Sequence, residues 1–209
     1  MTGKVLVFSR RLITGFEPFT PALGEMDLGA IGDDCWWEAR TAAERSTNAV
    51  QAIPAAVLCD SAGNYLLLQR VDEARKSLRS RLSLVIGGHV EPPAGADLPP
   101  EVNFETLLRT TLLRELREEL SLQLDPGALE SVGMVVDPRG LDASRHVAFV
   151  YRATLGRSMD VDVTAFEEFA VDSAFSTRMW PGRQLRRLLP SLDPWSAILV
   201  RSGALLGSG

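Results

Sequence analysis

The segment from Asn103 to Leu120 constrains the fold more than any other part of the sequence. Apolar side chains recur in it at helical spacing, at Phe104, Leu107, Leu108, Leu112, Leu116 and Leu120. This spacing is typical of a helix with one buried face. Asn103 is a suitable N-cap residue, so we predict one long helix from about Asn103 to about Leu120.

Three carboxylates, Glu115, Glu118 and Glu119, lie off the apolar stripe of this helix. Their i, i+3, i+4 spacing places them on one face, where like charges repel by a few tenths of a kcal/mol per pair. A cation that gathers the carboxylates would explain the arrangement, and oxygen ligands favour Mg²⁺ or Mn²⁺ over zinc. The alternative is a solvated face with an ordinary ion pair between Arg114 and Glu118.

Two glycines end the predicted strand that precedes this helix. The apolar run 82–90 predicts a strand, and it contains Gly87 and Gly88. Because glycine has no Cβ, these residues permit a strained bend and let a backbone carbonyl approach a ligand closely.

Together the glycines and the helix resemble the signature of the Nudix (MutT-like) hydrolases. The box of that family reads Gly, five residues, Glu, seven residues, then Arg-Glu-U-x-Glu-Glu-x-Gly-U, where U is a bulky aliphatic residue. Here Gly88 matches the opening Gly, the run 114–119 matches the core, and Leu122 matches the final aliphatic residue. The Gly-Gly-His run with a long loop after it is similar to one branch of the family.

The sequence departs from the family pattern in two places. Gly88 and Arg114 are 26 positions apart (114 − 88) where the family has 14, so about 12 residues, roughly 92–103, are inserted. Thr106 then occupies the position of the first Glu of the box, with Glu105 beside it, and Ser121 replaces the second Gly. The insert is rich in proline, so we expect an exposed loop.

The resemblance implies Mg²⁺- or Mn²⁺-dependent hydrolysis of a diphosphate linkage in a nucleoside diphosphate derivative or similar compound. It implies a metal held by Glu115, Glu118, Glu119 and a carbonyl of Gly88 or Gly87, with Arg114 orienting a glutamate. Glu115 is our first candidate for the general base, and Glu167 or Glu168 the second.

Arg70, Arg81 and His89 are candidate substrate-binding residues because they lie near the glycines in the sequence. The alternatives are surface positions for the arginines and a structural hydrogen bond for His89. Two other functions stay open for the chain, a Nudix-fold isomerase and a Nudix-fold binding or regulatory module without turnover. The isomerase would need a catalytic Cys in its own motif and extra metal-binding histidines, and neither Cys35 nor Cys59 has the required setting.

The remaining pattern predicts an α+β chain. Strands are expected at 4–8, 52–59, 65–69, 132–136 and 146–154, an irregular stretch at 12–44, and helical segments at 184–189 and 195–200. This order favours an α/β/α sandwich with a mixed sheet, as the resemblance implies. We expect an N-terminal extension or small subdomain over residues 1–50 and a Nudix domain over residues 51–209.

The composition limits the classes of molecule that the protein is expected to bind. A net charge of −5 and a pI near 5.2 argue against a surface that binds nucleic-acid polymers. No apolar run approaches the roughly 18 residues of a membrane span, and the N-terminus has no signal-peptide core. We therefore expect a cytoplasmic enzyme with two reduced cysteines, a small phosphate-containing substrate and a homodimer as the commonest assembly. His89 and His146 are far apart in the sequence, so we expect no zinc cluster.

Overall fold

The computed structural model describes residues 3–21, 28–69, 81–92, 103–140, 143–156 and 178–205. Its strands are β1 (Lys4–Ser9), β2 (Phe19–Pro21), β3 (Trp36–Ala39), β4 (Ala49–Asp60), β5 (Asn64–Gln69), β6 (Leu82–Ser83), β7 (Val85–Gly87), β8 (Leu129–Val136), β9 (His146–Leu155) and β10 (Arg178–Pro181). Its α-helices are α1 (Leu28–Asp33), α2 (Arg40–Ala43), α3 (Phe104–Leu120) and α4 (Pro194–Ser202). Short 3₁₀ segments lie at Arg10–Ile13, Pro126–Ala128, Ala143–Arg145 and Gly182–Ser191.

Strand β4 is the centre of a mixed sheet whose order is β10-β5-β4-β9-β8-β2. It is buried from Ala49 to Cys59, as expected of a strand covered on both faces. It pairs with β9 in parallel and with β1, β5 and β7 antiparallel. Strands β1 and β3, from the first fifty residues, therefore belong to the same sheet.

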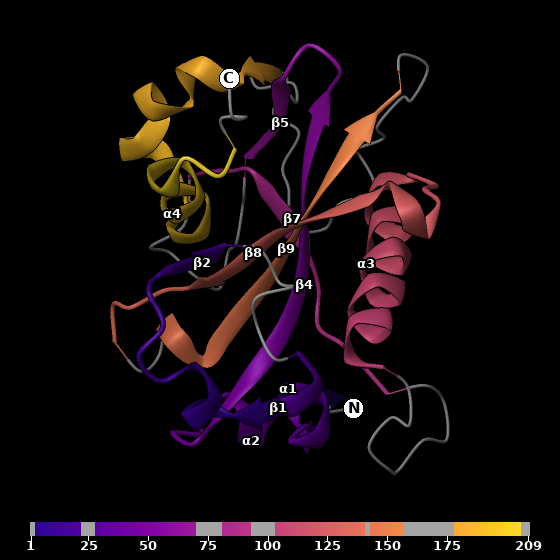
Figure 1. Ribbon diagram of the computed structural model, residues 1–209, viewed down its shortest axis with the longest axis vertical. Coiled ribbons are helices and arrows are strands. Elements are labelled where there is room, and N and C mark those ends of the chain that lie inside the picture. The colour runs from indigo at the N-terminus through magenta and orange to yellow at the C-terminus, as the bar shows by residue number, and fades with distance from the viewer. Residues whose placement is uncertain are drawn as a thin grey trace.

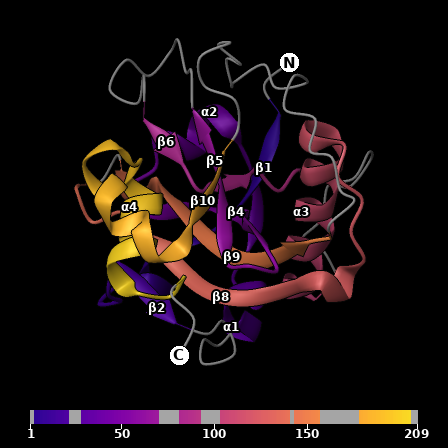
Figure 2. The same cartoon turned by 90° about the horizontal axis from the view of Figure 1, so that it is seen from above.

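Two helical layers cover the sheet, α3 on one face and α4 on the other (Figures 1 and 2). Alternate β4 residues enter two separate cores: Ala52 packs with the leucines of α3, and Val57 packs with α4. The structure is thus an α/β/α sandwich, as predicted.

Helix α3 forms because its apolar stripe meets the sheet and both of its ends are capped. The Asn103 side chain accepts a hydrogen bond from the Thr106 backbone N–H, which confirms the predicted N-cap. At the other end Ser121 adopts the left-handed conformation with φ 53° and ψ 23°. Glycine is usual at such a position, so Ser121 performs the turn at a modest conformational cost. The Leu122 N–H closes the cap on the Leu116 carbonyl at 3.1 Å.

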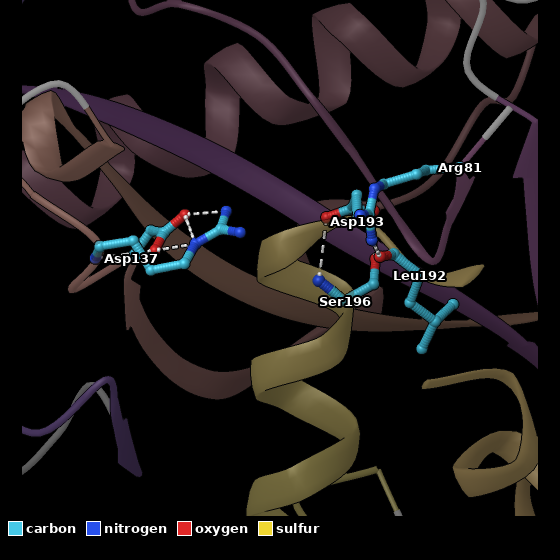
Figure 3. Close-up of polar contacts among 6 residues, drawn as sticks. Arg81, Asp137, Leu192, Asp193 and Ser196 are labelled. Atoms are coloured by element: carbon cyan, nitrogen blue, oxygen red, sulfur yellow. Dashed lines mark hydrogen bonds and ion pairs between the residues drawn. The ribbon is translucent and has the colours of Figure 1, made fainter. Parts of the chain in front are cut away.

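A buried polar network attaches α4 to the strands that lead to the glycines (Figure 3). Asp193 caps α4 by accepting from the Ser196 N–H at 3.0 Å and from its hydroxyl at 2.6 Å. The Ser196 hydroxyl oxygen in turn accepts from the Leu84 N–H at 2.8 Å. Arg81 donates to the Leu192 carbonyl at 2.9 Å, so the α4 end and the β6–β7 segment are held in one register.

Three local predictions need correction. The expected strand 82–90 is two short strands that break at Leu84 and end at Gly87. The stretch 12–44, expected to be irregular, contains β2, α1, β3 and α2. The helical segment 184–189 lies in a 3₁₀ segment rather than an α-helix. The three differences have one cause: short elements are stabilised by tertiary contacts and leave little periodicity in the sequence.

Candidate functional site

One side of β4 pairs first with β1 and then with β7, and the candidate site lies next to this change of partner. Gln51 pairs with β1, and Ala55 pairs with Gly87 of β7. Pro54 lies between these two pairings, so the N–H that proline lacks is not needed for a hydrogen bond to β1 or β7. Gly87 crosses directly over it, since a Cβ on Gly87 would lie 2.1 Å from the Pro54 carbonyl oxygen.

Gly88 is the point at which the strand meets α3. A Cβ on Gly88 would lie 2.4 Å from the Glu115 carboxyl carbon. This contact joins the two halves of the sequence motif, since Gly88 and Glu115 are 27 positions apart (115 − 88). The glycine is therefore required for close approach of the backbone to the carboxylate.

Arg114 is the counter-ion of the carboxylates on this face of α3. Its guanidinium donates to Glu115 at 2.5 Å and to Glu118 at 2.7 Å. The Glu115 side chain is only 13% exposed, whereas that of Glu118 is 52% exposed. The predicted Arg114–Glu118 ion pair is thus present, and it shares its arginine with the buried carboxylate.

Burial raises the pKa of Glu115 above its ordinary value, and the charge of Arg114 partly offsets the increase. The neighbouring carboxylates of Glu118 and Glu91 raise this pKa further. Glu91 follows the Gly-Gly-His-Val run, and sequence reasoning gave it no role. The site thus concentrates negative charge around one buried carboxyl group, which is the setting in which a divalent cation gains most.

An all-oxygen donor set suits Mg²⁺ or Mn²⁺ here. The room left by Gly88 and the carboxylates of Glu115, Glu118 and Glu119 fit such an ion. Within the described part of the chain, however, these three carboxylates do not converge to within 4.8 Å of one another. Arg114 holds two of them in its own ion pairs, so the ion would have to displace it.

Arg81, a candidate substrate-binding residue, lies away from these carboxylates. Arg81 lies on the α4 face, where it lines a pocket of about 740 Å³ with Arg139 and Arg201. Asp137, on the wall of that pocket, binds Arg139 at 2.6 Å (Figure 3). Because α3 covers the opposite face of the sheet, this pocket is separate from the carboxylates. Arg70, Glu167 and Glu168 lie outside the described residues.

Glu105, beside the first-Glu position of the box, is not at the site. It pairs with Arg109 one turn further along α3 at 2.8 Å. Arg109 in turn donates to the Leu129 carbonyl at 2.7 Å and lies over the Tyr151 ring. Glu105 and Arg109 therefore have a structural role, because their contacts attach α3 to β8 and β9.

His89 and His146, which are far apart in the sequence, lie side by side in the structure. The rings of His89 and His146 lie 5.6 Å apart, and Glu44 lies 3.6 Å from the His146 Nε2. Sequence analysis missed this group because its members come from α2, the loop after β7 and the start of β9. No spacing rule links residues so far apart in a chain.

The two glycines predict contrasting mutant effects. Gly87→Ala would drive a methyl group into the Pro54 backbone, so we expect it to destabilise folding by about 2 kcal/mol or more. Gly88→Ala meets only the movable end of Glu115, so we expect about 1 kcal/mol or less but at least tenfold weaker Mn²⁺ binding. Urea unfolding and Mn²⁺ electron paramagnetic resonance measure the two effects. Equal destabilisation with unchanged Mn²⁺ affinity in Gly88→Ala would contradict the assigned geometry.

Glu115 predicts a pH dependence of stability in metal-free protein. Its folded-state pKa exceeds its unfolded value, so the folded state binds the proton more tightly and stability falls as pH rises through the folded pKa. Glu115→Gln removes this effect, so in EDTA we expect it to be at least as stable as wild type near neutral pH. The advantage should vanish by about pH 4, below the unfolded pKa.

Urea unfolding of Glu115→Gln at both pH values checks this result, with Glu130→Gln as the control because its side chain is 71% exposed and does not contribute to the shift of Glu115. A Glu115→Gln variant that is less stable than wild type near neutral pH would show that the ionised carboxylate is stabilising.

No family model matches the sequence, and no curated protein matches it either. Among solved structures, Tm1382, assigned to the Nudix hydrolases, is 22% identical with a TM-score of 0.70 over 97% of this chain and 99% of its own. The MutT protein of Methanosarcina mazei Go1 is 16% identical with a TM-score of 0.50, over 77% and 96% of the two chains. The Nudix domain of Shewanella oneidensis NrtR, in complex with ADP ribose, is 18% identical with a TM-score of 0.50, over 74% and 86%. These likenesses concern the fold, and the fold of this chain is that of the Nudix hydrolases.

Proposed function

We propose that this protein is a Mg²⁺- or Mn²⁺-dependent hydrolase that cleaves a diphosphate linkage in a nucleoside diphosphate derivative or similar compound. The contact between Gly88 and Glu115 carries the proposal, because it forms one site from the two halves of the box despite the insert between them. The NrtR Nudix domain binds ADP ribose, a compound of this chemical class, on a related fold.

The proposed metal ligands are Glu115, Glu118, Glu119 and the Gly88 carbonyl, with Gly87 supplying the bend. When bound, the ion would neutralise diphosphate oxygens and lower the pKa of the attacking water. Before the ion binds, Arg114 would orient the Glu115 and Glu118 carboxylates through its ion pairs, and the ion would then displace it.

Glu115 is our proposed general base. A base that works near neutral pH needs a pKa above that of a free carboxyl group, and burial shifts Glu115 in this direction. Its carboxylate also lies against Gly88, so it borders the space that the substrate and ion would occupy. Glu167 and Glu168 remain the second candidates for this role.

Of the proposed substrate-binding residues, His89 adjoins the site in sequence, whereas Arg81 faces the pocket beside α4. Arg81 would therefore contact substrate only if the bound molecule extended past the end of β7. We therefore propose that the metal ion and Arg70 make the main contacts with the substrate phosphates.

A binding module without turnover is the second candidate function. The ion pairs of Arg114 favour it, because they neutralise two of the proposed ligands in the absence of metal. Hydrolysis separates the two functions, since a binding module would take up ligand without releasing product.

Turnover of a panel of diphosphate compounds that includes ADP ribose tests the proposal. With Mg²⁺ or Mn²⁺ we expect wild type to release product, and Glu118→Gln to lower kcat/KM by about 10²-fold or more. Glu130→Gln is the matched control, because this glutamate is 71% exposed and its side chain pairs with Arg152, which binds the Ala204 carbonyl after α4. Binding of a compound without metal-dependent hydrolysis, equal in wild type and Glu118→Gln, would support the binding module instead.

A further inference from the structure

The geometry points to a second metal site, formed by Glu44, His89 and His146, that binds a zinc-class transition-metal ion. One ligand atom from each of these residues lies within 4.8 Å of the other two. Two imidazoles and one carboxylate form a donor set that zinc prefers and that Mg²⁺ does not. The site therefore differs in chemistry from the oxygen-only carboxylates of α3.

The distance between two of the ligand atoms is close to that of a filled site. Ligand atoms around tetrahedral zinc lie about 3.3 Å apart, given metal–ligand distances of about 2.0–2.1 Å. Glu44 Oε1 and His146 Nε2 are already 3.6 Å apart. The His146 side chain is 13% exposed and that of Glu44 35% exposed, so the site is largely shielded but open to an entering ion.

The surrounding backbone fixes the three ligands. His146 is the first residue of β9, and Glu44 is the C-cap residue of α2. Arg40 restrains Glu44 from one turn earlier, at 4.0 Å. His89 follows Gly88, whose backbone lies against Glu115. An ion here would attach the Gly-Gly-His segment to both α2 and β9.

Gln51 provides an independent indication of a missing ligand. It pairs with His146 in the parallel β4–β9 register, so the two side chains lie side by side on one face of the sheet. Gln51 is fully buried, yet neither its amide nitrogen nor its amide oxygen has a hydrogen-bond partner among the described residues. Buried polar groups are rarely left in this state. A water in the fourth position of the ion would supply the partner.

The chain contains only two histidines, so histidine NMR reports this site alone. We expect one equivalent of Zn²⁺, added to untagged metal-free protein, to shift the imidazole signals of both His89 and His146 together, whereas Mg²⁺ shifts neither. Zn²⁺ at about one hundred times its Kd should also raise the Tm by about 5–10 °C. Zinc that leaves either imidazole signal unchanged at one equivalent would overturn the site.

Variants test the ligands one at a time, with Co²⁺ as the probe. His146→Gln and Glu44→Gln should each lower Co²⁺ affinity at least tenfold and weaken the visible absorption seen at one equivalent of Co²⁺. Glu118→Gln should retain both, because it alters only the α3 carboxylates. Equal Co²⁺ binding by wild type and His146→Gln would contradict the assignment. This result is independent of turnover, so failure of the zinc site leaves the proposed hydrolysis standing, and the reverse also holds.

Discussion

The candidate site depends on the close contacts that the backbone makes at Gly87 and Gly88. Gly87 lies over the Pro54 carbonyl, and Gly88 lies against the carboxylate of Glu115. Any side chain at either position would push β7 away from β4 or displace Glu115 from the sheet. The site therefore depends on two contacts that only glycine permits, made where β4 changes its partner from β1 to β7.

The second constraint is electrostatic. The Glu115 side chain is largely buried, and its ion-pair partner in the described structure, Arg114, is shared with Glu118. A largely buried carboxylate that is only partly neutralised destabilises the fold. Such destabilising groups are retained mainly at functional sites. A divalent cation would remove that cost by taking the place of Arg114 beside Glu115 and Glu118. Stability and function thus oppose each other at this residue.

Sequence patterns predicted the elements that depend on local periodicity and missed those that depend on tertiary contact. Helix α3, with its Asn103 cap, was predicted because the apolar stripe and the cap lie within one segment. The 3₁₀ segment at Gly182–Ser191 and the break at Leu84 were not, because packing rather than propensity sets them. Likewise the family resemblance located Gly88 and Glu115, whereas the Glu44–His146 contact required the parallel β4–β9 register to be known.

We propose that the carboxylates of α3 and the backbone of Gly88 hold a divalent metal ion. A crystal structure of the protein grown with Mn²⁺, with anomalous differences measured, tests this proposal directly. We expect an anomalous peak bounded by Gly88, Glu115, Glu118 and Glu119, with Arg114 moved from its present ion pairs. A fully ordered α3 with no peak there, and Arg114 still bound to Glu115 and Glu118, would contradict it.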